Sequence, residues 1–217
     1  MGLLPLLQSD PLAFGLVVLV LLVSLALHEW GHAVTALWMG DPTARDQGRV
    51  TLNPFKHLDL IGSIMILLVG FGWARPVPIY PPNFRQYRLG LFVVSIAGIF
   101  INLLIATALA LVLRGILATG LLDNPSGFVL VIAQAMAVAA SINLTLAVFN
   151  LLPIPPLDGS KILQSVLPLR WHSYIWRLES NPAYAIVAML LLLTVLRQPL
   201  SSFLGLVRAR FFESFGL

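Results

Sequence analysis

Residues 11–32 read PLAFGLVVLVLLVSLALHEWGH, an apolar run without charge as far as Leu27 that ends in the motif His28-Glu-Trp-Gly-His32. About 20 predominantly apolar residues in a helix are enough to cross a bilayer, so the run predicts a membrane helix. An ionisable side chain in hydrocarbon costs roughly 3 kcal/mol or more and usually lines a site or a pathway. The three ionisable side chains at the end of this run therefore predict a functional site within the membrane.

The composition of the whole chain is that of an integral membrane protein. Of its 217 residues, 59% are hydrophobic and only 10% are charged, roughly half or less of the charge of a soluble domain. The first basic residue is Arg45, so the first apolar run lacks the charged segment that opens a signal peptide, and we expect it to be retained as a helix. Three further uncharged runs follow, at Leu89–Leu113, Asn124–Leu157 and Ser180–Leu196.

Charge and cysteine content narrow the function. The net charge is +4, but the 13 basic residues are scattered among the predicted loops and form no stripe with interleaved aromatic residues, so we expect no nucleic-acid partner. Because the chain has no cysteine, it has no thiolate nucleophile and no thiolate metal ligand. Histidine, aspartate and glutamate are then the strong metal ligands that remain.

The sequence predicts an all-α polytopic membrane protein with four to six membrane segments and short β-strands in the loop after the first helix. That helix covers residues 11–40 and ends at Gly40-Asp41-Pro42, and two further spans cover about 89–113 and 127–150. The uncharged segment Leu60–Ala74 is short and interrupted by glycines, which favours a re-entrant segment over a full crossing.

The third span must end well before Asp158. A straight helix over the uncharged run 124–157 would be about 50 Å long. The prolines within 153–156 end it just after Asn150 and leave Asp158 on an irregular backbone. At membrane depth such a backbone survives only where it is buried in protein or lines a cavity, so Asp158 is expected to face a cavity.

The C-terminal part is expected to lie at the membrane interface and then return to the membrane. Residues 161–179 combine tryptophan, tyrosine and arginine, which is typical of an interfacial helix, and the apolar tail 182–206 is either one kinked span or a short hairpin. We expect one membrane domain over residues 1–217, with a core of 11–163 and C-terminal helices in 164–217.

The basic residues predict the orientation. If Leu60–Ala74 dips into the membrane and returns, most of them lie on one side, which the positive-inside rule assigns to the cytosol, with the N-terminus and the Arg114 turn outside. His28 and Asp158 then both lie toward the cytosolic half, whereas a full crossing would place them near opposite faces. The expected location is a prokaryotic plasma membrane. The residues of the basic side are Arg45, Arg49, Lys56, Arg75, Arg85, Arg88, Lys161, Arg170 and Arg177.

The spacing of the two histidines permits metal binding. His28 and His32 are four residues apart and so share a helical face, where two imidazoles can bind one zinc ion with Glu29 beside the open position. Zinc acidifies a bound water and the carboxylate takes up its proton, which is the chemistry of a metalloprotease. The alternative is a pair of buried histidines with ordinary hydrogen-bond partners, and it is weak inside a membrane span.

A catalytic zinc ion normally has three protein ligands, so one more is needed. Asp158 is favoured because it follows the longest uncharged run, and its alternative role is the N-cap of a helix that begins near Gly159. We interpret His57 and Asp59 as parts of a solvated interfacial loop, and the alternative is that they orient a ligand or the re-entrant segment. The other candidates are His172, to which we assign no chemistry, and Glu179.

Four motifs together carry a resemblance that covers most of the chain from about residue 27 to 163. They are HEWGH at 28–32, GDP at 40–42 with GRVTLNPFKHLD at 48–59, GFGWARPVP at 70–78, and FNLLPIPPLDG at 149–159. With these motifs the chain resembles the site-2 protease family of intramembrane zinc metalloproteases, in particular its compact branch without a PDZ domain.

The resemblance implies a site and a substrate. His28, His32 and Asp158 would bind one zinc ion per chain, Glu29 would be the catalytic base, and the substrate would be a membrane-embedded peptide segment in the lipid bilayer. Asn150 matches the motif asparagine that binds substrate backbone or the oxyanion, and an amide can donate a hydrogen bond there. Its alternative is a hydrogen bond to the carbonyl groups at the helix end.

One segment departs from the family pattern. Similar proteins carry Ala-Gly-Pro-x-x-Asn in the second span, whereas this chain reads AGIFIN at residues 97–102. Loss of the proline should straighten that helix, which affects the local packing expected from the family and not the metal site.

The expected strands suggest how a substrate could bind. Segments 50–52 and 77–80 have the composition of edge strands, and an extended peptide could pair with such an edge before hydrolysis. Proline substitutions at Val50 or Thr51 that left cleavage intact would count against this hypothesis.

Two other functions are compatible with polar residues in membrane helices. A divalent-metal transporter predicts ligands from discontinuous helices and usually internal repeats, and no repeat is evident. A catalytically inactive relative that acts as a binding protein is the second alternative, and an intact Glu29 argues against it. The oligomeric state is left open by the sequence.

Overall fold

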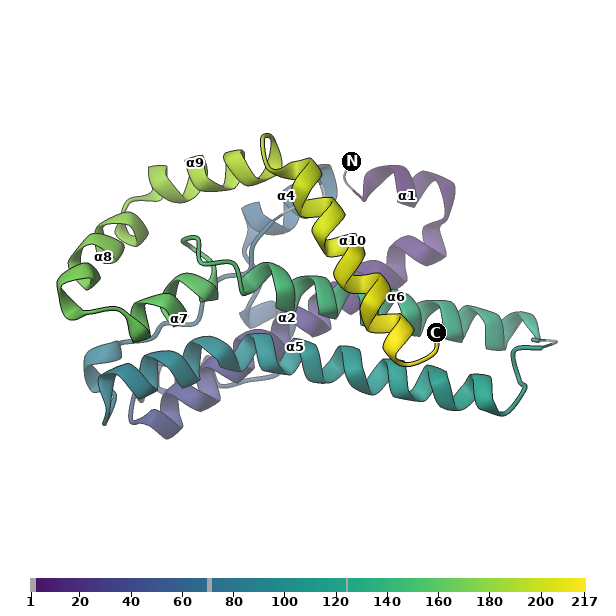
Figure 1. Ribbon diagram of the computed structural model, residues 1–217, viewed down its shortest axis with the longest axis horizontal. Helices are drawn as coiled ribbons and strands as arrows, with labels where there is room; N and C mark the ends of the chain where they lie inside the picture. Colours follow the sequence, from purple (N-terminus) through teal and green to yellow (C-terminus); the bar gives the residue numbers. More distant parts are fainter. Residues whose placement is uncertain (1–2, 70–71, 124) are drawn as a thin grey trace.

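The structure is a computed structural model that describes residues 3–69, 72–123 and 125–217 (Figure 1). Within these ranges, three helices are long and apolar enough to cross a membrane: α2 (Pro11–Met39), α5 (Tyr87–Ala118) and α6 (Gly127–Asn150). Helix α5 packs against both α2 and α6. The three spans that the sequence predicts are therefore confirmed, the third of them with the same bounds.

The ends of α2 follow from local chemistry. A short helix α1 (Leu4–Ser9) precedes it, and the Asp10 side chain then caps α2 by accepting a hydrogen bond of 2.9 Å from the backbone N–H of Ala13. At the other end Gly40 adopts φ 109°, a left-handed conformation that favours glycine and ends the helix. Between these caps α2 runs for 29 residues, about 44 Å at 1.5 Å per residue, which is ample for a bilayer.

Helices α2 and α5 approach each other closely at Gly31. A Cβ atom added to Gly31 would collide with Ile101 Cδ1 and lie 3.4 Å from the backbone oxygen of Ala97, and Ala33 and Ala97 nearby are both buried. Small residues of this kind let two membrane helices bring their backbones together. The contact places the His28-to-His32 turn of α2 directly against α5.

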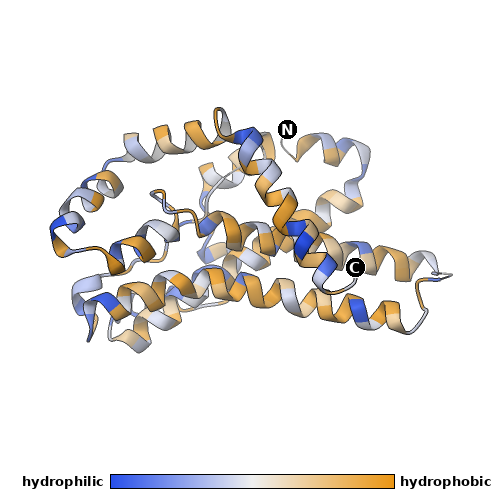
Figure 2. Ribbon diagram, viewed as in Figure 1, coloured by the Kyte–Doolittle hydropathy of each residue, from blue (hydrophilic) through white to orange (hydrophobic). Residues whose placement is uncertain are grey.

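The outer faces of the long helices are apolar. Figure 2 shows hydrophobic residues along the length of α5 and α6, and large side chains such as Phe100, Leu104 and Leu111 of α5 are exposed in the isolated chain. Large exposed apolar surfaces mark membrane or protein contacts. Together with the lengths of the three helices, this surface identifies an integral membrane protein.

The loop after α2 is held by Asp41, which is fully buried. Its carboxylate accepts hydrogen bonds from the Thr43 and Tyr80 backbone N–H groups, at 3.1 and 2.6 Å, and from Asn83 Nδ2 at 2.9 Å. Burial by itself raises the pKa of Asp41, but hydrogen bonds from Thr43, Tyr80 and Asn83 outweigh it and hold the pKa below its ordinary value. The Asp41 carboxylate thus joins the beginning and the end of the segment between α2 and α5.

The segment expected to be re-entrant returns to its starting point. Helix α4 (Leu60–Val69) has 10 residues, about 15 Å, which is half the thickness of the hydrocarbon layer. Leu58 and Ala74 form an isolated antiparallel bridge, and the N–H of Arg75 donates to the His57 oxygen at 2.8 Å. This geometry agrees with a segment that enters and leaves on one side; Gly70 of the motif GFGWARPVP lies outside the described residues.

The β-strands expected in this loop are not formed by the described residues. Besides the Leu58–Ala74 bridge, the loop contains α3 (Thr43–Asp46) and two 3-10 turns, η1 (Pro54–Lys56) and η2 (Pro81–Asn83). The physical reason lies in the backbone donors. The N–H of Arg49 bonds back to the Ala44 oxygen at 2.8 Å, and the N–H of Val77, flanked by two prolines, donates to Glu29. These backbone N–H groups are therefore not available for hydrogen bonds between β-strands.

After α6 the chain forms four shorter helices, α7 (Asp158–Val166), α8 (His172–Ser180), α9 (Pro182–Leu193) and α10 (Arg197–Ser214), with a 3-10 turn η3 (Leu169–Trp171) between α7 and α8. The single interfacial helix expected over 161–179 is thus two helices, separated near Pro168. Helix α9 has 12 residues, too few to cross a bilayer alone. Among the described residues only α2, α5 and α6 meet the criteria for a span, so the expected four to six segments are not confirmed.

Candidate metal centre

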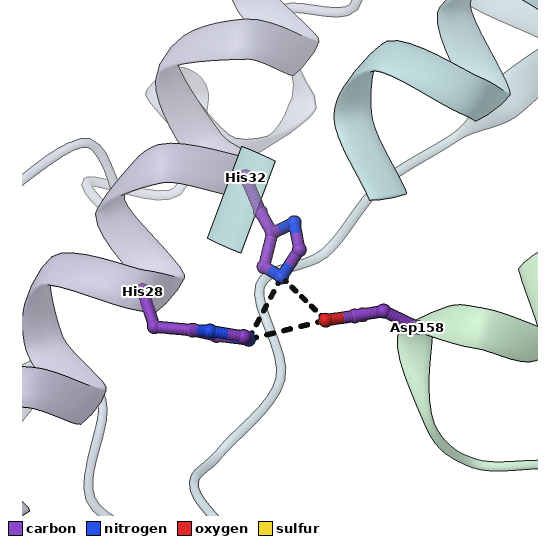
Figure 3. Close-up of side chains that lie close together, drawn as sticks. All are labelled: His28, His32 and Asp158. Carbon is purple, nitrogen blue, oxygen red and sulfur yellow. Dashed lines mark hydrogen bonds and ion pairs between the residues drawn. The ribbon is translucent and has the colours of Figure 1, made fainter. Parts of the chain in front are cut away.

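Three side chains converge on one point between α2 and α7 (Figure 3). The Nε2 atoms of His28 and His32 are 3.1 Å apart, and Asp158 Oδ2 lies 3.2 Å from the first and 3.3 Å from the second. Both histidines are 5% exposed. The structure thus brings together the three residues that the sequence analysis favoured as metal ligands, although Asp158 follows His32 by 126 residues in the chain.

The triangle of ligand atoms has the size that zinc requires. With zinc–ligand distances of about 2.0–2.1 Å, tetrahedral geometry sets neighbouring ligand atoms roughly 3.3 Å apart. The three observed distances are 3.1, 3.2 and 3.3 Å. Asp158 Oδ2 is buried and accepts no well-aligned hydrogen bond from the described residues, so this oxygen is available to bind a metal ion. The donor set, two imidazoles and a carboxylate, fits a zinc ion with a fourth position open.

A backbone carbonyl fixes the tautomer of the neutral His32 ring. His32 Nδ1 lies 2.7 Å from the oxygen of Val94 in α5. A carbonyl can only accept, so in the neutral ring Nδ1 carries the hydrogen and Nε2 keeps its lone pair. That lone pair points toward the other two ligand atoms, which is the arrangement found in metal-ligating histidines.

Helix α5 also provides the space for the imidazoles. A Cβ atom added to Gly98 would lie 2.6 Å from the Nε2 atoms of both His28 and His32. A side chain larger than a hydrogen atom would therefore press on the two rings. The glycine is needed so that the imidazoles can approach the α5 backbone, and not for its own backbone conformation.

Asp158 is placed by the irregular segment that follows α6. A Cβ atom added to Gly159 would collide with the backbone oxygens of Leu151 and Leu152, so the start of α7 packs tightly on this segment, which contains a cis peptide bond between Pro155 and Pro156. Asp158 is the first residue of α7, and the N-cap position is held by Leu157. The N-cap position considered as an alternative for Asp158 is therefore held by its neighbour, and the Asp158 carboxylate faces the histidines.

Glu29 lies in the same cavity and is held by the loop. Its Oε2 atom accepts a hydrogen bond of 3.0 Å from the N–H of Val77. Buried Arg49 holds the same loop, because its Nη2 atom donates to the Arg75 oxygen at 2.7 Å. Burial and the charge of Arg75 lower the pKa of Arg49, against the opposite effect of the Glu29 charge. Residues 75–77 are thus tied to the helix that carries the two histidines.

The cavity around these residues has a volume of about 1330 Å³. Its wall is mainly apolar and comes from α2, α5, α6 and the loop residues 72–79, with Arg208 and Phe212 of α10 on one side. Asn150, the last residue of α6, lines it and donates from Nδ2 to the Leu146 oxygen at 3.0 Å. The local hydrogen bond expected as its alternative is therefore present, and the amide also borders the cavity.

Three of the other candidate ligands, His57, Asp59 and His172, have partners elsewhere. His57 is 1% exposed, with Nε2 at 2.9 Å from the Thr51 oxygen, so its interpretation as a solvated loop residue was wrong. Asp59 Oδ1 accepts from the Gly62 N–H at 2.8 Å, and His172 packs against Tyr87. The side chain of Glu179 lies outside the described residues.

Several residues of the site were not found from the sequence. The hydrogen bonds of Val94 and Val77 use backbone groups, which leave no trace in residue type. Gly98 and Asn102 belong to the segment AGIFIN, which the sequence comparison with the family marked only as a departure. The regular spacing of Val94, Gly98 and Asn102, four residues apart, was a signal that could have placed all three on the face of α5 toward α2.

Three side chains with the geometry of a metal site, beside apolar helices of membrane length, are typical of integral membrane metalloproteins. Comparison with known proteins narrows this class. Residues 123–194 match the family model of peptidase family M50. The chain is 40% identical over 186 residues to "Putative zinc metalloprotease YwhC" of Bacillus subtilis, which covers 86% of this chain and 82% of that protein.

The chain is also 39% identical over 163 residues to "Putative zinc metalloprotease Rip2" of Mycobacterium tuberculosis, covering 71% of this chain and 60% of that protein. No solved structure matches the chain. The extent and identity of the first match are decisive: this chain belongs to peptidase family M50, and it is a membrane metalloprotease. The resemblance drawn from the sequence motifs is thereby confirmed.

Proposed function

We propose that the protein is an intramembrane zinc endopeptidase that hydrolyses peptide bonds of transmembrane substrate segments. His28, His32 and Asp158 bind one zinc ion and Glu29 acts as the catalytic base. The observation that carries the proposal is the triangle of three candidate ligand atoms, 3.1 to 3.3 Å on each side, beside a glutamate in a cavity that residues of the three membrane-length helices line.

The roles of the side chains follow from their chemistry. A zinc ion held by His28, His32 and Asp158 would polarise the scissile carbonyl and lower the pKa of a water, so that the water could lose a proton to a base near neutral pH. Glu29 takes up the proton of that water and delivers it to the leaving amine. The Val77 N–H keeps one carboxylate oxygen in place at 3.0 Å, and the other oxygen remains to accept the proton. Asn150 has a second amide hydrogen, besides the one given to Leu146, to donate to the substrate carbonyl.

The cavity supports a peptide substrate with apolar side chains. Its wall is predominantly apolar, and it lies among α2, α5 and α6, where an apolar segment can enter from the lipid bilayer. A small ion would not need about 1330 Å³ of such space. The substrate class proposed is therefore a membrane-embedded segment of another protein.

We place the site toward the cytosolic half of a prokaryotic plasma membrane. The charge bias and the re-entrant segment led to the expectation that His28 and Asp158 lie at the same end of the molecule. Their side chains are 3.2 Å apart, which supports the topology on which this orientation rests.

The test is cleavage of a panel of transmembrane peptides in liposomes by the purified protein, with bound zinc measured by elemental analysis. Glu29→Gln should bind zinc as the wild type does and lose at least about 100-fold in rate, the scale of general acid–base catalysis. Glu213→Gln, an exposed glutamate of α10 that pairs with Arg210, is the matched control and should cleave normally. Zinc-loaded wild type that cleaves no peptide, or a fully active Glu29→Gln, would count against the proposal.

A further inference from the structure

We propose that Asn102 is a positioning residue for the metal site: its Oδ1 atom accepts a hydrogen bond from Nδ1–H of His28 and so fixes the ring with its Nε2 lone pair toward the zinc ion. The inference rests on the proposed function, in which His28 is a zinc ligand. Asn102 contacts His28 and is not among the described residues that line the cavity, so its effect on catalysis is exerted through the ligand.

One face of α5 provides the surroundings of both histidines. Val94, Gly98 and Asn102 recur every four residues and therefore lie on the same side of the helix. Val94 bonds to His32 through its carbonyl oxygen, Gly98 leaves room for both rings, and the Asn102 amide lies 3.2 Å from His28 Nδ1. Asn102 thus occupies, for His28, the place that the Val94 carbonyl occupies for His32.

The Asn102 amide is buried, which requires an explanation in an apolar helix. Asn102 is 0% exposed, in a helix whose other residues are mostly apolar. A buried amide costs free energy unless its polar atoms are paired. Yet one end of this amide, assigned as Oδ1, has no hydrogen-bond partner within the described residues. A side chain kept in such a place needs a purpose besides packing.

The chemistry of the ligand decides which end of the amide faces the ring. With Nδ2 toward Nδ1, the ring nitrogen must accept, and the hydrogen then sits on Nε2. It would point at His32 Nε2, 3.1 Å away, and at Asp158, where the metal must bind. A half-turn of the amide exchanges its oxygen and nitrogen. Oδ1 then accepts Nδ1–H, and Nε2 is free for zinc.

The experiment measures zinc affinity in the purified full chain, by competition with a chelating dye, for wild type and three variants. Asn102→Leu removes the acceptor at similar volume. Asn102→Asp keeps an acceptor oxygen and removes the amide donor. Asn143→Leu is the matched control. Asn143 is also buried, but it lies in α6 and its Nδ2 atom donates a hydrogen bond of 2.9 Å to Ser24 Oγ and not to a histidine.

Asn102→Leu should bind zinc about 10- to 100-fold more weakly, the usual cost of losing a partner of a ligating histidine. Asn102→Asp should bind zinc within about threefold of the wild-type affinity, because it keeps an acceptor oxygen for the ligating histidine. Asn143→Leu should also keep its affinity, and the visible spectrum of bound cobalt should change in Asn102→Leu alone. The Asp variant decides the case even if Asn102→Leu does not fold.

Two results would overturn the inference: Asn102→Leu that binds zinc as tightly as wild type, or Asn102→Asp that loses zinc because the Nδ2 end is the one required. If the Asn143 control lost as much affinity as Asn102→Leu, a general effect of removing a buried amide would replace the specific one. A wild type without zinc affinity would instead reject the proposed function itself, and this inference with it.

Discussion

Glu29 and Val77 are joined by a hydrogen bond of 3.0 Å, in which the backbone N–H of Val77 donates to Glu29 Oε2. The bond links the helix of the histidines to the loop that closes the cavity, so the proposed base is oriented by the loop and not by its own helix. A substrate that moves this loop would also move the base, which couples loop position to reactivity.

Replacing Val77 by proline removes the donor and should reduce cleavage. A hydrogen bond to a charged group contributes about 1.5–3 kcal/mol, so the rate should fall roughly 10- to 100-fold if the bond is kept in the transition state. Zinc content should not change, because Val77 touches no ligand atom in the triangle. Val77→Ala keeps the N–H and is the control. Equal rates for the proline and alanine variants would show that the bond does not matter.

Gly98→Ala should abolish zinc binding while the chain still folds. The new Cβ atom would lie 2.6 Å from both Nε2 atoms, so the two imidazoles must move apart and leave the geometry that zinc needs. Gly115→Ala in the same helix has nothing within 4 Å and serves as the control.

Alanine favours a helix over glycine by about 1 kcal/mol, so neither variant should unfold the helix. Zinc per chain and the thermal unfolding midpoint are measured together for both. A Gly98→Ala protein with one zinc ion per chain would contradict the close approach seen at this residue.

Much of the arrangement was predictable because it depends on side-chain type. The long apolar runs, the proline cluster of 153–156 and Gly40 predict where helices begin and end. The meeting of His28 with Asp158 followed from counting crossings, once Leu60–Ala74 was interpreted as re-entrant. These features depend on composition and spacing, which is why the three spans and the meeting of His28, His32 and Asp158 could be anticipated.

What could not be predicted depends on backbone groups and on absent atoms. The Val94 carbonyl and the Val77 N–H exist at any residue, so no pattern marks them as partners of His32 and Glu29. Gly98 contributes through the absence of a Cβ atom, which leaves room for the two imidazole rings. His57 was misjudged because a polar residue in a loop is ordinarily solvated, whereas here the ring is buried with Nε2 at 2.9 Å from the Thr51 backbone oxygen.

Asp41→Asn should destabilise the protein by about 1–3 kcal/mol at neutral pH, which lowers Tm by roughly 3–10 °C in a chain of this size. The folded-state pKa of Asp41 lies below the ordinary value near 3.8, since hydrogen bonds from Thr43, Tyr80 and Asn83 outweigh the effect of burial. A lowered pKa contributes stability above the unfolded-state pKa, and this stability is lost as the pH falls through the folded-state value.

The difference between wild type and Asp41→Asn should therefore be constant above about pH 5 and shrink below about pH 4. Unfolding curves in detergent from pH 3 to 8 measure it. Asp46→Asn, an exposed aspartate in the same loop, is the control and should change little. A difference that grows on acidification would refute the sign of this prediction.

The orientation can be tested directly because the chain has no cysteine, so single cysteines can be placed without background. Gln47, Gln86, Asp123 and Arg170 are exposed and lie in the successive loops and the region after α6. With a re-entrant α4, cysteines at 47, 86 and 170 should react with a membrane-impermeant maleimide from the cytosolic side, and a cysteine at 123 from the outside. If residues 60–74 crossed fully, positions 47 and 123 would share one side, and 86 and 170 the other. Right-side-out and inside-out vesicles separate these two patterns, and the second would remove the basis for placing the site toward the cytosol.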